Sequence, residues 1–401
     1  MAFRGWSLGG GRLPVLALLV VVLLAGPALP AAGQTAADDA LDADITAAGA
    51  VVWDPLDGRV LWGREPSTPR RMASTTKIMT ALLAVEADTL DDTVTVSATA
   101  DAADDGPGAA TLNLRAGERV GMRNVLTALM MRSGNEAAAA VAEHVAGSQN
   151  AFVVAMNVRG RELGLDDTRF LDTTGLSDSA AHHASPVDLA RLAQTAMALP
   201  GFAGLVGTYR ADIPGFGTLT SRNLLLDRYR GATGVKTGYT ALAGLCLVAS
   251  ATRDGRTYYT AVLDSDDTFA DTTLLLDHAF DAYTVVAADA VAAGVYRTSD
   301  GTVPLRIADS APHTVPVAAT VRVRSTLLPT ASSPIVDGTP LGRADLVVDG
   351  EVVDTATIES AGALDAAPTR SAAASAGAAV EDAVRAFARA TPRRAPVRTG
   401  G

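Results

Sequence analysis

The sequence predicts an α+β fold, in which helices cover an antiparallel sheet, an all-helical lobe is inserted between the strands, and a small all-β domain follows. Strand patterns begin near residue 50 and return after residue 218, while helical patterns fill most of the segment between them. Short β-rich runs then occupy residues 300–362. At 401 residues, the chain is long enough for two or three domains with well-buried cores.

Residues 1–33 have the pattern of an export signal. Arg4 and Arg12 supply positive charge, residues 13–25 are apolar, and small residues suited to cleavage precede residue 34. We therefore expect an exported protein of the extracytoplasmic cell envelope. The alternative is an uncleaved membrane anchor, which the glycine and prolines after residue 25 disfavour. Residues 34–45 are small and acidic, which predicts a linker.

Residues 46–285 are expected to form one domain that carries the chemistry. Its patterns predict, in order, a hairpin around residues 50–62, helices over about 74–86, 122–131, 136–146 and 148–163 and from 186, strands over 244–251 and 257–263, and a closing helix around 274–280. The turn between the first two strands is Asp57-Gly58, and Ser185 precedes Pro186 as a helix cap. The alternation of elements predicts a sheet that is completed only after the helical segment.

The chain has only two lysines, Lys77 and Lys236, against 31 arginines. A buried lysine amine can be tuned to accept a proton, whereas an arginine guanidinium cannot lose its proton in a protein. Lys77 follows Ser74 by three residues, so both lie on one face of the expected helix. A serine hydroxyl needs an adjacent base to act as a nucleophile. Lys77, desolvated and near a second cation such as Lys236, would have a lowered pKa and could accept the Ser74 proton.

Three short motifs occur in a fixed order along the chain. They are S-x-x-K at residues 74–77, S-G-N at 133–135 and K-T-G at 236–238, and each lysine of the chain belongs to one of them. This set is the signature of serine acyl transfer. The S-G-N motif falls between two expected helices, from which it can direct side chains into a cleft.

The remaining motif residues have the chemistry that acyl transfer requires. The backbone N–H groups of Ser74 and Tyr239 could bind an oxyanion, and Gly238 would let a substrate lie against its strand as an extra edge. Ser133 could relay a proton to the leaving group, and Asn135 could hold a substrate amide.

A terminal carboxylate is the substrate group that Lys236 and Thr237 would suit. The serine mechanism calls for no cofactor and no metal. The five histidines show no metal-ligand spacing with cysteine or with one another.

On these motifs the sequence resembles the low-molecular-weight penicillin-binding D-alanyl-D-alanine carboxypeptidases over roughly residues 46–285. Met72-Ala73 before the nucleophile and residues 222–225 and 234–240 are also similar to family segments. The resemblance implies a β-lactamase/D,D-peptidase-like fold. It also implies an exported enzyme that removes the terminal D-alanine of peptidoglycan stem peptides through an acyl-serine intermediate and is inhibited by β-lactams.

Several alternatives stay open. Some relatives carry an arginine after the strand that follows K-T-G, but residues 264–267 are acidic here, which leaves the binding of the substrate carboxylate unexplained. A D,D-endopeptidase shares the motifs, and so does a serine β-lactamase, for which Glu162 is the nearest match to the deacylating glutamate. A non-catalytic β-lactam or muropeptide sensor is disfavoured, because the motif residues are intact: Ser74, Lys77, Ser133 and Lys236.

Charge and composition limit the partners. A net charge of −11 and 4% aromatic residues argue against nucleic-acid binding. The single cysteine, Cys246, lies in an apolar run and is expected to be packed. Residues 363–401 are rich in Ala, Pro and Arg, and we expect most of this tail to be disordered. A narrow apolar face at residues 380, 384 and 387 leaves open whether the tail contacts a membrane surface or is solvated.

Overall fold

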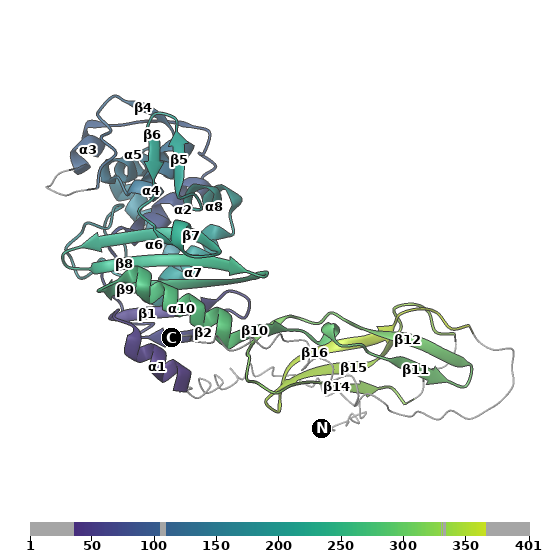
Figure 1. Cartoon of the computed structure of the whole chain (residues 1–401). Coiled ribbons are helices and arrows are strands. Elements are labelled where there is room, and N and C mark those ends of the chain that lie inside the picture. The colour runs from purple at the N-terminus through teal and green to yellow at the C-terminus, as the bar shows by residue number, and fades with distance from the viewer. Residues whose placement is uncertain (1–35, 105–109, 330, 332–333, 366–401) are drawn as a thin grey trace, which may run out of the picture. The chain divides into compact units, whose positions relative to one another are not determined.

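The computed structural model describes residues 36–104, 110–329, 331 and 334–365 (Figure 1). It confirms the expected α+β fold. The central sheet is antiparallel throughout and has the order β2-β1-β9-β8-β7, from strands β1 (Gly49–Asp54), β2 (Arg59–Arg64), β7 (Ala232–Thr240), β8 (Gly244–Arg253) and β9 (Arg256–Ser265). The first two strands therefore join a sheet whose other three come about 180 residues later, and β7 forms one edge.

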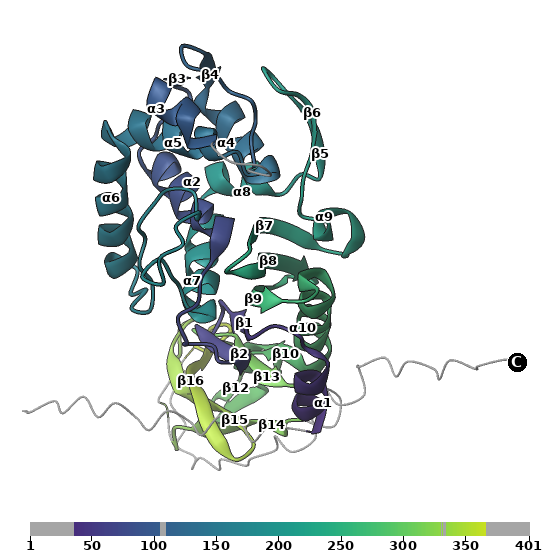
Figure 2. The same ribbon diagram turned by 90° about the vertical axis from the view of Figure 1, so that its left-hand side faces the viewer.

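Helices cover both faces of this sheet (Figure 2). Successive residues of β1 alternate between the two faces, as the pleat requires. Val52 packs in the core that contains Leu276 of α10 (Thr268–Ala282), whereas Val51 packs in the core that contains Leu189 of α7 (Pro186–Met197). On the α7 side, Trp53 Nε1 donates a hydrogen bond to Gln194 Oε1 at 2.6 Å. Both faces of β1 are therefore buried, so this strand lies inside the core on either side of the sheet.

The helical lobe fills the segment between β2 and β7. It contains η1 (a 3₁₀ helix, Ala73–Thr76), α2 (Lys77–Glu86), β3 (Thr93–Thr95), α3 (Ala98–Asp101), η2 (Ala102–Asp104), β4 (Arg119–Gly121), α4 (Met122–Arg132), α5 (Asn135–Ala146), α6 (Gln149–Glu162), α8 (Pro200–Val206), the hairpin β5 (Arg210–Ile213) and β6 (Gly217–Thr220), and α9 (Leu225–Arg228). The first eight residues of α5 are all buried, and most of them are alanines. Small side chains let neighbouring helices approach closely, so α5 lies in the centre of the lobe with Asn135 at its start.

The C-terminal β-rich region has its own core. A five-stranded sheet of order β11-β12-β16-β15-β14 and the pair β10-β13 are built from β10 (Tyr283–Val286), η3 (Ala288–Ala290), β11 (Val295–Thr298), β12 (Gly301–Ala308), β13 (His313–Pro316), β14 (Val321–Leu327), β15 (Pro340–Val348) and β16 (Glu351–Ser360). Within the expected β-rich segment, a turn separates β13 from β14. The N–H of Ala319 donates to the Pro316 carbonyl at 3.0 Å, which ends one strand before the next begins.

The segment expected to be a linker differs from that expectation. Residues Ala36–Asp44 form helix α1, because Leu41 and Ile45 lie four residues apart and are both buried in the core that contains α10. No single described helix is long and apolar enough to cross a membrane; α7 and α8 reach that length only together, with a 111° bend between them. The expected export signal and nearly all of the expected tail, with residues 380, 384 and 387, lie outside the described residues.

Candidate active site

Ser74 lies in a short turn that leads directly into α2. The preceding residue, Ala73, has a φ of 47°, which turns the chain sharply before the 3₁₀ helix. Ser74 is 9% exposed. The spacing of three residues places Lys77 below it at the first turn of α2, and Lys77 Nζ donates to Ser74 Oγ at 2.9 Å. The one direct hydrogen bond expected between a nucleophile and its base is therefore in place.

Lys77 is completely buried and has two further acceptors. Its Nζ donates to Asn135 Oδ1 at 3.0 Å and to the Thr174 carbonyl at 2.6 Å. Burial lowers the pKa of Lys77 to about 7, although the charges of Asp172 and Glu136 oppose this shift. An amine with this pKa is partly unprotonated at neutral pH, so it can accept the proton of the serine hydroxyl.

The Thr174 carbonyl is held by a loop that Asp172 organises. The Asp172 carboxylate accepts hydrogen bonds from the N–H groups of Thr174, Gly175 and Ser177 at 2.5–2.7 Å. Burial would raise the pKa of Asp172, but these N–H bonds oppose burial and help to hold the pKa below its usual value. A Cβ on Gly175 would lie 1.9 Å from the Ala73 carbonyl oxygen, so the loop packs directly on the Ser74 turn.

His182 ties this loop to the Ser74 turn by hydrogen bonds at both ring nitrogens. Nδ1 accepts from the Leu171 N–H at 2.9 Å, so the ring proton is on Nε2, which donates to Thr76 Oγ1 at 2.9 Å. The Thr76 hydroxyl in turn donates to the Ala73 carbonyl at 2.8 Å. Burial lowers the pKa of His182, which favours this neutral ring.

The S-G-N motif connects α4 and α5 in the centre of the helical lobe. Ser133 ends α4 with a left-handed φ of 73°, and Asn135 begins α5. Both residues are buried, yet Ser133 Oγ and Asn135 Nδ2 have no hydrogen-bond partner among the described residues. Buried polar atoms are normally paired, so these two groups are available to a ligand.

Lys236 lies on edge strand β7, the strand that packs against the Ser74 turn from the side opposite the helical lobe. It is also buried, but among the described residues its Nζ has a single acceptor, the Thr237 carbonyl at 2.9 Å. Burial lowers the pKa of Lys236 far below its usual value, and the charges of Lys77 and Arg222 lower it further. A carboxylate bound here would favour the protonated form of Lys236 again and would accept from its unused donors.

Gly238 lets β7 lie against the backbone of Ser74. A Cβ at this position would lie 3.0 Å from the Ser74 nitrogen and 3.1 Å from the Ala73 Cβ, so any larger residue would separate the strand from the turn. The next residue, Tyr239, is 64% exposed at the edge of the sheet. The structure thus brings residues 236–239 of β7 alongside Ser74, while Lys77 and Asn135 approach it from the helical lobe.

Sequence reasoning assigned no role to Arg222, Asp172 or His182. The Arg222 N–H donates to the Met131 carbonyl at 3.0 Å, close to Ser133 in the chain, and the Arg222 charge lowers the pKa of both lysines. In the sequence, Arg222 is marked only by the similarity of residues 222–225 to a family segment, which by itself predicts no function.

Two other candidates lie outside this cleft. Glu162 is at the exposed end of α6, where its carboxylate accepts from Arg159 Nη1 at 3.1 Å. Cys246 is buried on β8, and burial raises the pKa of its thiol to about 12, which keeps it protonated. The acidic residues after β9 include Asp267, which caps α10 by accepting from the N–H groups of Phe269 and Ala270.

The chain matches the peptidase S11 family, described as D-alanyl-D-alanine carboxypeptidase, over residues 33–267. It is similar to the D-alanyl-D-alanine carboxypeptidase DacF of Bacillus subtilis, with 33% identity over 59% of this chain and 63% of that protein. It is also similar to a D-alanyl-D-alanine endopeptidase of Escherichia coli, with 31% identity over 62% of this chain and 81% of that protein. Among solved structures, penicillin binding protein 6B from Escherichia coli matches 78% of this chain and 95% of its own, with 28% identity and a TM-score of 0.64.

Proposed function

Because the chain belongs to the peptidase S11 family of D-alanyl-D-alanine carboxypeptidases, we propose that it removes the terminal D-alanine from peptidoglycan stem peptides through an acyl-serine intermediate. The observation that carries this proposal is the buried Ser74–Lys77 pair, with a 2.9 Å hydrogen bond and a lysine pKa of about 7. The chain spans 63% of the length of its Bacillus subtilis relative, so the activity is proposed from the geometry of this chain together with its family.

Acylation begins when unprotonated Lys77 accepts the Ser74 proton and Oγ attacks the carbonyl carbon of the scissile peptide bond. The backbone N–H groups of Ser74 and Tyr239 stabilise the oxyanion, since Gly238 brings the strand within contact of the Ser74 nitrogen. Ser133, whose buried hydroxyl is unpaired among the described residues, relays the proton that Lys77 took from Ser74 to the departing D-alanine amine. Water then cleaves the ester and restores the Ser74 hydroxyl.

The terminal carboxylate of the substrate binds on the β7 side of the cleft. Lys236 and Thr237 lie there, and Arg222 contributes positive charge to the same space. Some relatives carry an arginine after the strand that follows K-T-G, where this chain has acidic residues. Arg222 therefore supplies the positive charge that this arginine would provide. Asn135 holds a substrate amide through its unpaired Nδ2 while its Oδ1 keeps Lys77 in position.

The direct test is incubation of the purified protein with a pentapeptide that ends in D-Ala-D-Ala. We expect mass spectrometry to detect the tetrapeptide and free D-alanine, and penicillin to add one adduct at Ser74. The Ser74→Ala variant should do neither. An adduct on another residue, or undiminished cleavage by Ser74→Ala, would contradict the assignment.

A β-lactamase would hydrolyse its penicilloyl ester rapidly, whereas the penicilloyl ester of this protein is expected to persist. A class A β-lactamase needs a glutamate that activates the deacylating water. Glu162 is exposed and bound to Arg159, so it does not supply this base. The penicilloyl ester should therefore persist for minutes or longer in intact-protein mass spectra. Rapid turnover that is lost in Glu162→Gln would favour the β-lactamase instead.

We also propose that the protein acts outside the cytoplasmic membrane, because residues 1–33 have the composition of an export signal. N-terminal sequencing of the protein recovered from the cell envelope should begin near Gln34. Contact of the tail with the membrane surface is a second part of this proposal. Cosedimentation of the full chain with anionic vesicles, compared with a chain that ends at residue 365, tests it.

A further inference from the structure

Lys77 Nζ has three hydrogen-bond partners among the described residues, and only one of them can donate a proton to it. Asn135 Oδ1 and the Thr174 carbonyl accept hydrogen bonds but cannot donate them, whereas the Ser74 hydroxyl can do either. An unprotonated amine has two N–H groups and one lone pair. When its two N–H groups bind the two acceptors, the lone pair points at Ser74 Oγ. The direction of the Thr174 carbonyl therefore helps to decide whether Lys77 can take the serine proton.

The Thr174 carbonyl belongs to a peptide unit that Asp172 holds from the other side. The N–H of the same unit is that of Gly175, and it donates to Asp172 Oδ1. The C=O and N–H of a trans peptide unit point in opposite directions, so one end meets Lys77 while the other meets the carboxylate. Asp172 Oδ1 also accepts from the Thr174 N–H at 2.7 Å and from the Thr174 hydroxyl at 3.0 Å.

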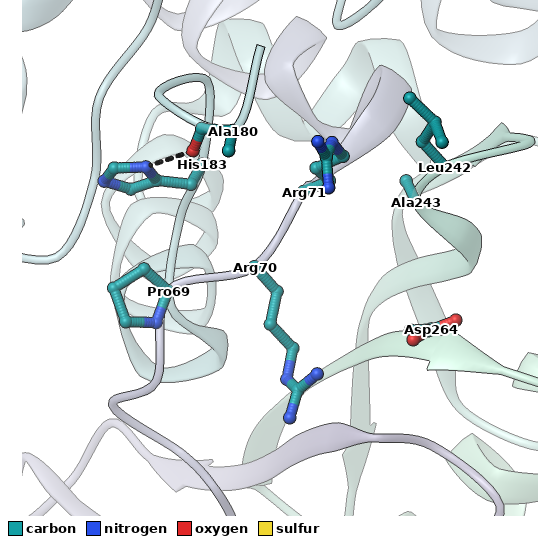
Figure 3. A pocket seen from close by; sticks show the side chains of 8 residues that line it. All are labelled: Pro69, Arg70, Arg71, Ala180, His183, Leu242, Ala243 and Asp264. Atoms are coloured by element: carbon teal, nitrogen blue, oxygen red, sulfur yellow. Dashed lines mark hydrogen bonds between the residues drawn. The ribbon is translucent and has the colours of Figure 1, made fainter. Parts of the chain in front are cut away.

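The two ends of this loop are attached by backbone hydrogen bonds that do not involve Asp172. Arg169 and His183 bond to each other at 2.8 and 3.1 Å, which closes the loop. Arg70 and Ala184 bond to each other at 2.9 and 3.0 Å, which ties the loop to the segment just before the Ser74 turn. Figure 3 shows Arg70 and His183 on these neighbouring segments. Loss of the Asp172 carboxylate should therefore leave the base of the loop in place.

Side chains also hold the backbone on either side of Asp172. His182 Nδ1 accepts from the Leu171 N–H at 2.9 Å, and Thr80 Oγ1 of α2 donates to the Thr173 carbonyl at 2.8 Å. These contacts position the residues next to Asp172 without its carboxylate. The peptide unit between residues 174 and 175, in contrast, has Asp172 and Lys77 as its partners. The orientation of this one unit therefore depends on the carboxylate.

Asp172 also brings negative charge to a site that contains several titratable groups. Those whose charges act on Lys77 or respond to it come from the loop, α5, β7 and the segment before α9: Asp172, His182, Glu136, Lys236 and Arg222. Burial lowers the pKa of Lys77 to about 7, the charges of Asp172 and Glu136 raise it, and the charge of Arg222 lowers it. Removal of the Asp172 charge should lower the pKa of Lys77 further.

We propose that Asp172 is a positioning residue, which orients the peptide unit 174–175 so that the lone pair of Lys77 is directed at Ser74, and which keeps a negative charge beside the amine. The carboxylate at the N–H end also polarises the peptide unit, so its carbonyl becomes a stronger acceptor for Lys77. This inference rests on the proposed function and deepens it, because Asp172 acts through a peptide unit and through Lys77 rather than on the substrate.

Two variants separate the charge of Asp172 from its hydrogen bonds. Asp172→Asn keeps an oxygen for the N–H groups of residues 174 and 175 but removes the charge, whereas Asp172→Ala removes both. The experiment measures the rate constant for acylation of the full-length protein by a fluorescent penicillin between about pH 5 and pH 10. The acid limb of this profile reports the pKa of the base, and the plateau reports how well the unprotonated base is oriented.

We expect the acid limb of Asp172→Asn to move to lower pH by about one unit, because the protonated amine loses a stabilising charge. Its plateau should stay within about fivefold of that of the parent. In Asp172→Ala the limb should move in the same direction, and the plateau should fall by about 10²-fold, since the Thr174 carbonyl is released. A purely structural defect would lower the rate at every pH without moving the limb.

Asp271 of α10 provides the matched control. It is also a buried aspartate that holds backbone N–H groups, those of Thr46 and Ala47 at 3.0 and 2.9 Å, but it packs on the face of the sheet away from α7. Asp271→Asn and Asp271→Ala should keep the acid limb of the parent, whatever they do to thermal stability.

The outcomes separate this inference from the function on which it rests. An acid limb of Asp172→Asn that coincides with that of the parent would overturn the proposal, and so would a plateau of Asp172→Ala no lower than that of Asp271→Ala. Both results would leave the proposed function intact. If Asp172→Ala does not fold, the limb of Asp172→Asn decides. Failure of the parent to form an adduct at Ser74 would instead overturn the proposed function and this inference together.

Discussion

The two sides of the cleft present lysines that are equally buried but differently surrounded. On the helical side, Lys77 donates to three acceptors and has two carboxylates near enough to oppose its loss of charge. On the sheet side, Lys236 donates to one carbonyl and is influenced by two other cations. Burial alone therefore does not determine what a buried lysine does.

The difference in partners separates two kinds of chemistry. The surroundings of Lys77 balance its pKa near 7, where an amine can both accept and return a proton. The surroundings of Lys236 leave it short of negative charge, which a substrate carboxylate would supply. We infer that the helical side handles the proton and the sheet side binds the anion, and four experiments test this division.

Lys77→Arg should show the largest effect. Arginine retains the positive charge but cannot act as a base at neutral pH, so the rate of penicillin acylation should fall by about 10³-fold. Intact-protein mass spectrometry against time measures it, with thermal unfolding as a control for folding. Acylation within about tenfold of the parent rate would mean that Lys77 acts only through its charge.

Lys236→Arg should reduce activity less than Lys77→Arg does, because anion binding needs the positive charge rather than a removable proton. We expect kcat/KM for the pentapeptide to fall by about 10²-fold, as the larger guanidinium displaces the carboxylate within a fully buried site. If this variant lost as much activity as Lys77→Arg, the division between the two sides would be wrong.

Protonation of Lys77 should also change the free energy of unfolding. Its pKa is lowered from 10.5 when exposed to about 7 in the folded protein, so between these values the unfolded chain binds the additional proton. The free energy of unfolding should therefore rise with pH in that window. Relative to Lys77→Met, the parent should lose about 2 kcal/mol between pH 9 and pH 6 in urea titrations. A difference that does not change with pH would contradict the lowered pKa.

Gly238→Ala tests the sheet side without changing a charge. The added methyl would meet the Ser74 nitrogen at 3.0 Å, so β7 must shift and the oxyanion donors separate. We expect acylation to slow by about tenfold. Gly204→Ala in α8 is the matched control, because a Cβ there meets nothing within 4 Å. Equal rates for both variants would show that the strand need not approach so closely.

The fold class could be predicted from the sequence because helix caps, turns and strand patterns are local signals. Ser185 caps α7 as expected, with its Oγ accepting from the Asp188 N–H, and Ser148 at the start of the expected helix 148–163 caps α6, with its Oγ accepting from the Ala151 N–H. Helix α1 was missed because its residues are mostly small and acidic, and only Leu41 and Ile45 anchor it to a distant helix. Such long-range packing cannot be read from a local pattern.

The candidate site was only partly accessible to sequence reasoning. Side chains with distinctive chemistry, such as Ser74 and the two lysines, could be found by their spacing. The acceptor supplied by Thr174 is a backbone carbonyl, which any residue could provide, so no side-chain identity marks it. Arg222 is one of 31 arginines, and its place beside the lysines depends on how the β5–β6 hairpin returns to α4.

The burial of Cys246 makes this protein suitable for site-specific labelling. Its thiol is 1% exposed and has a pKa of about 12, so maleimides and iodoacetamides should leave it unmodified at neutral pH. No other cysteine occurs in the chain. A cysteine introduced at an exposed position such as Leu242 would then be the sole reactive thiol, and a fluorophore attached there would report peptide binding along β7 without any need to remove the native residue.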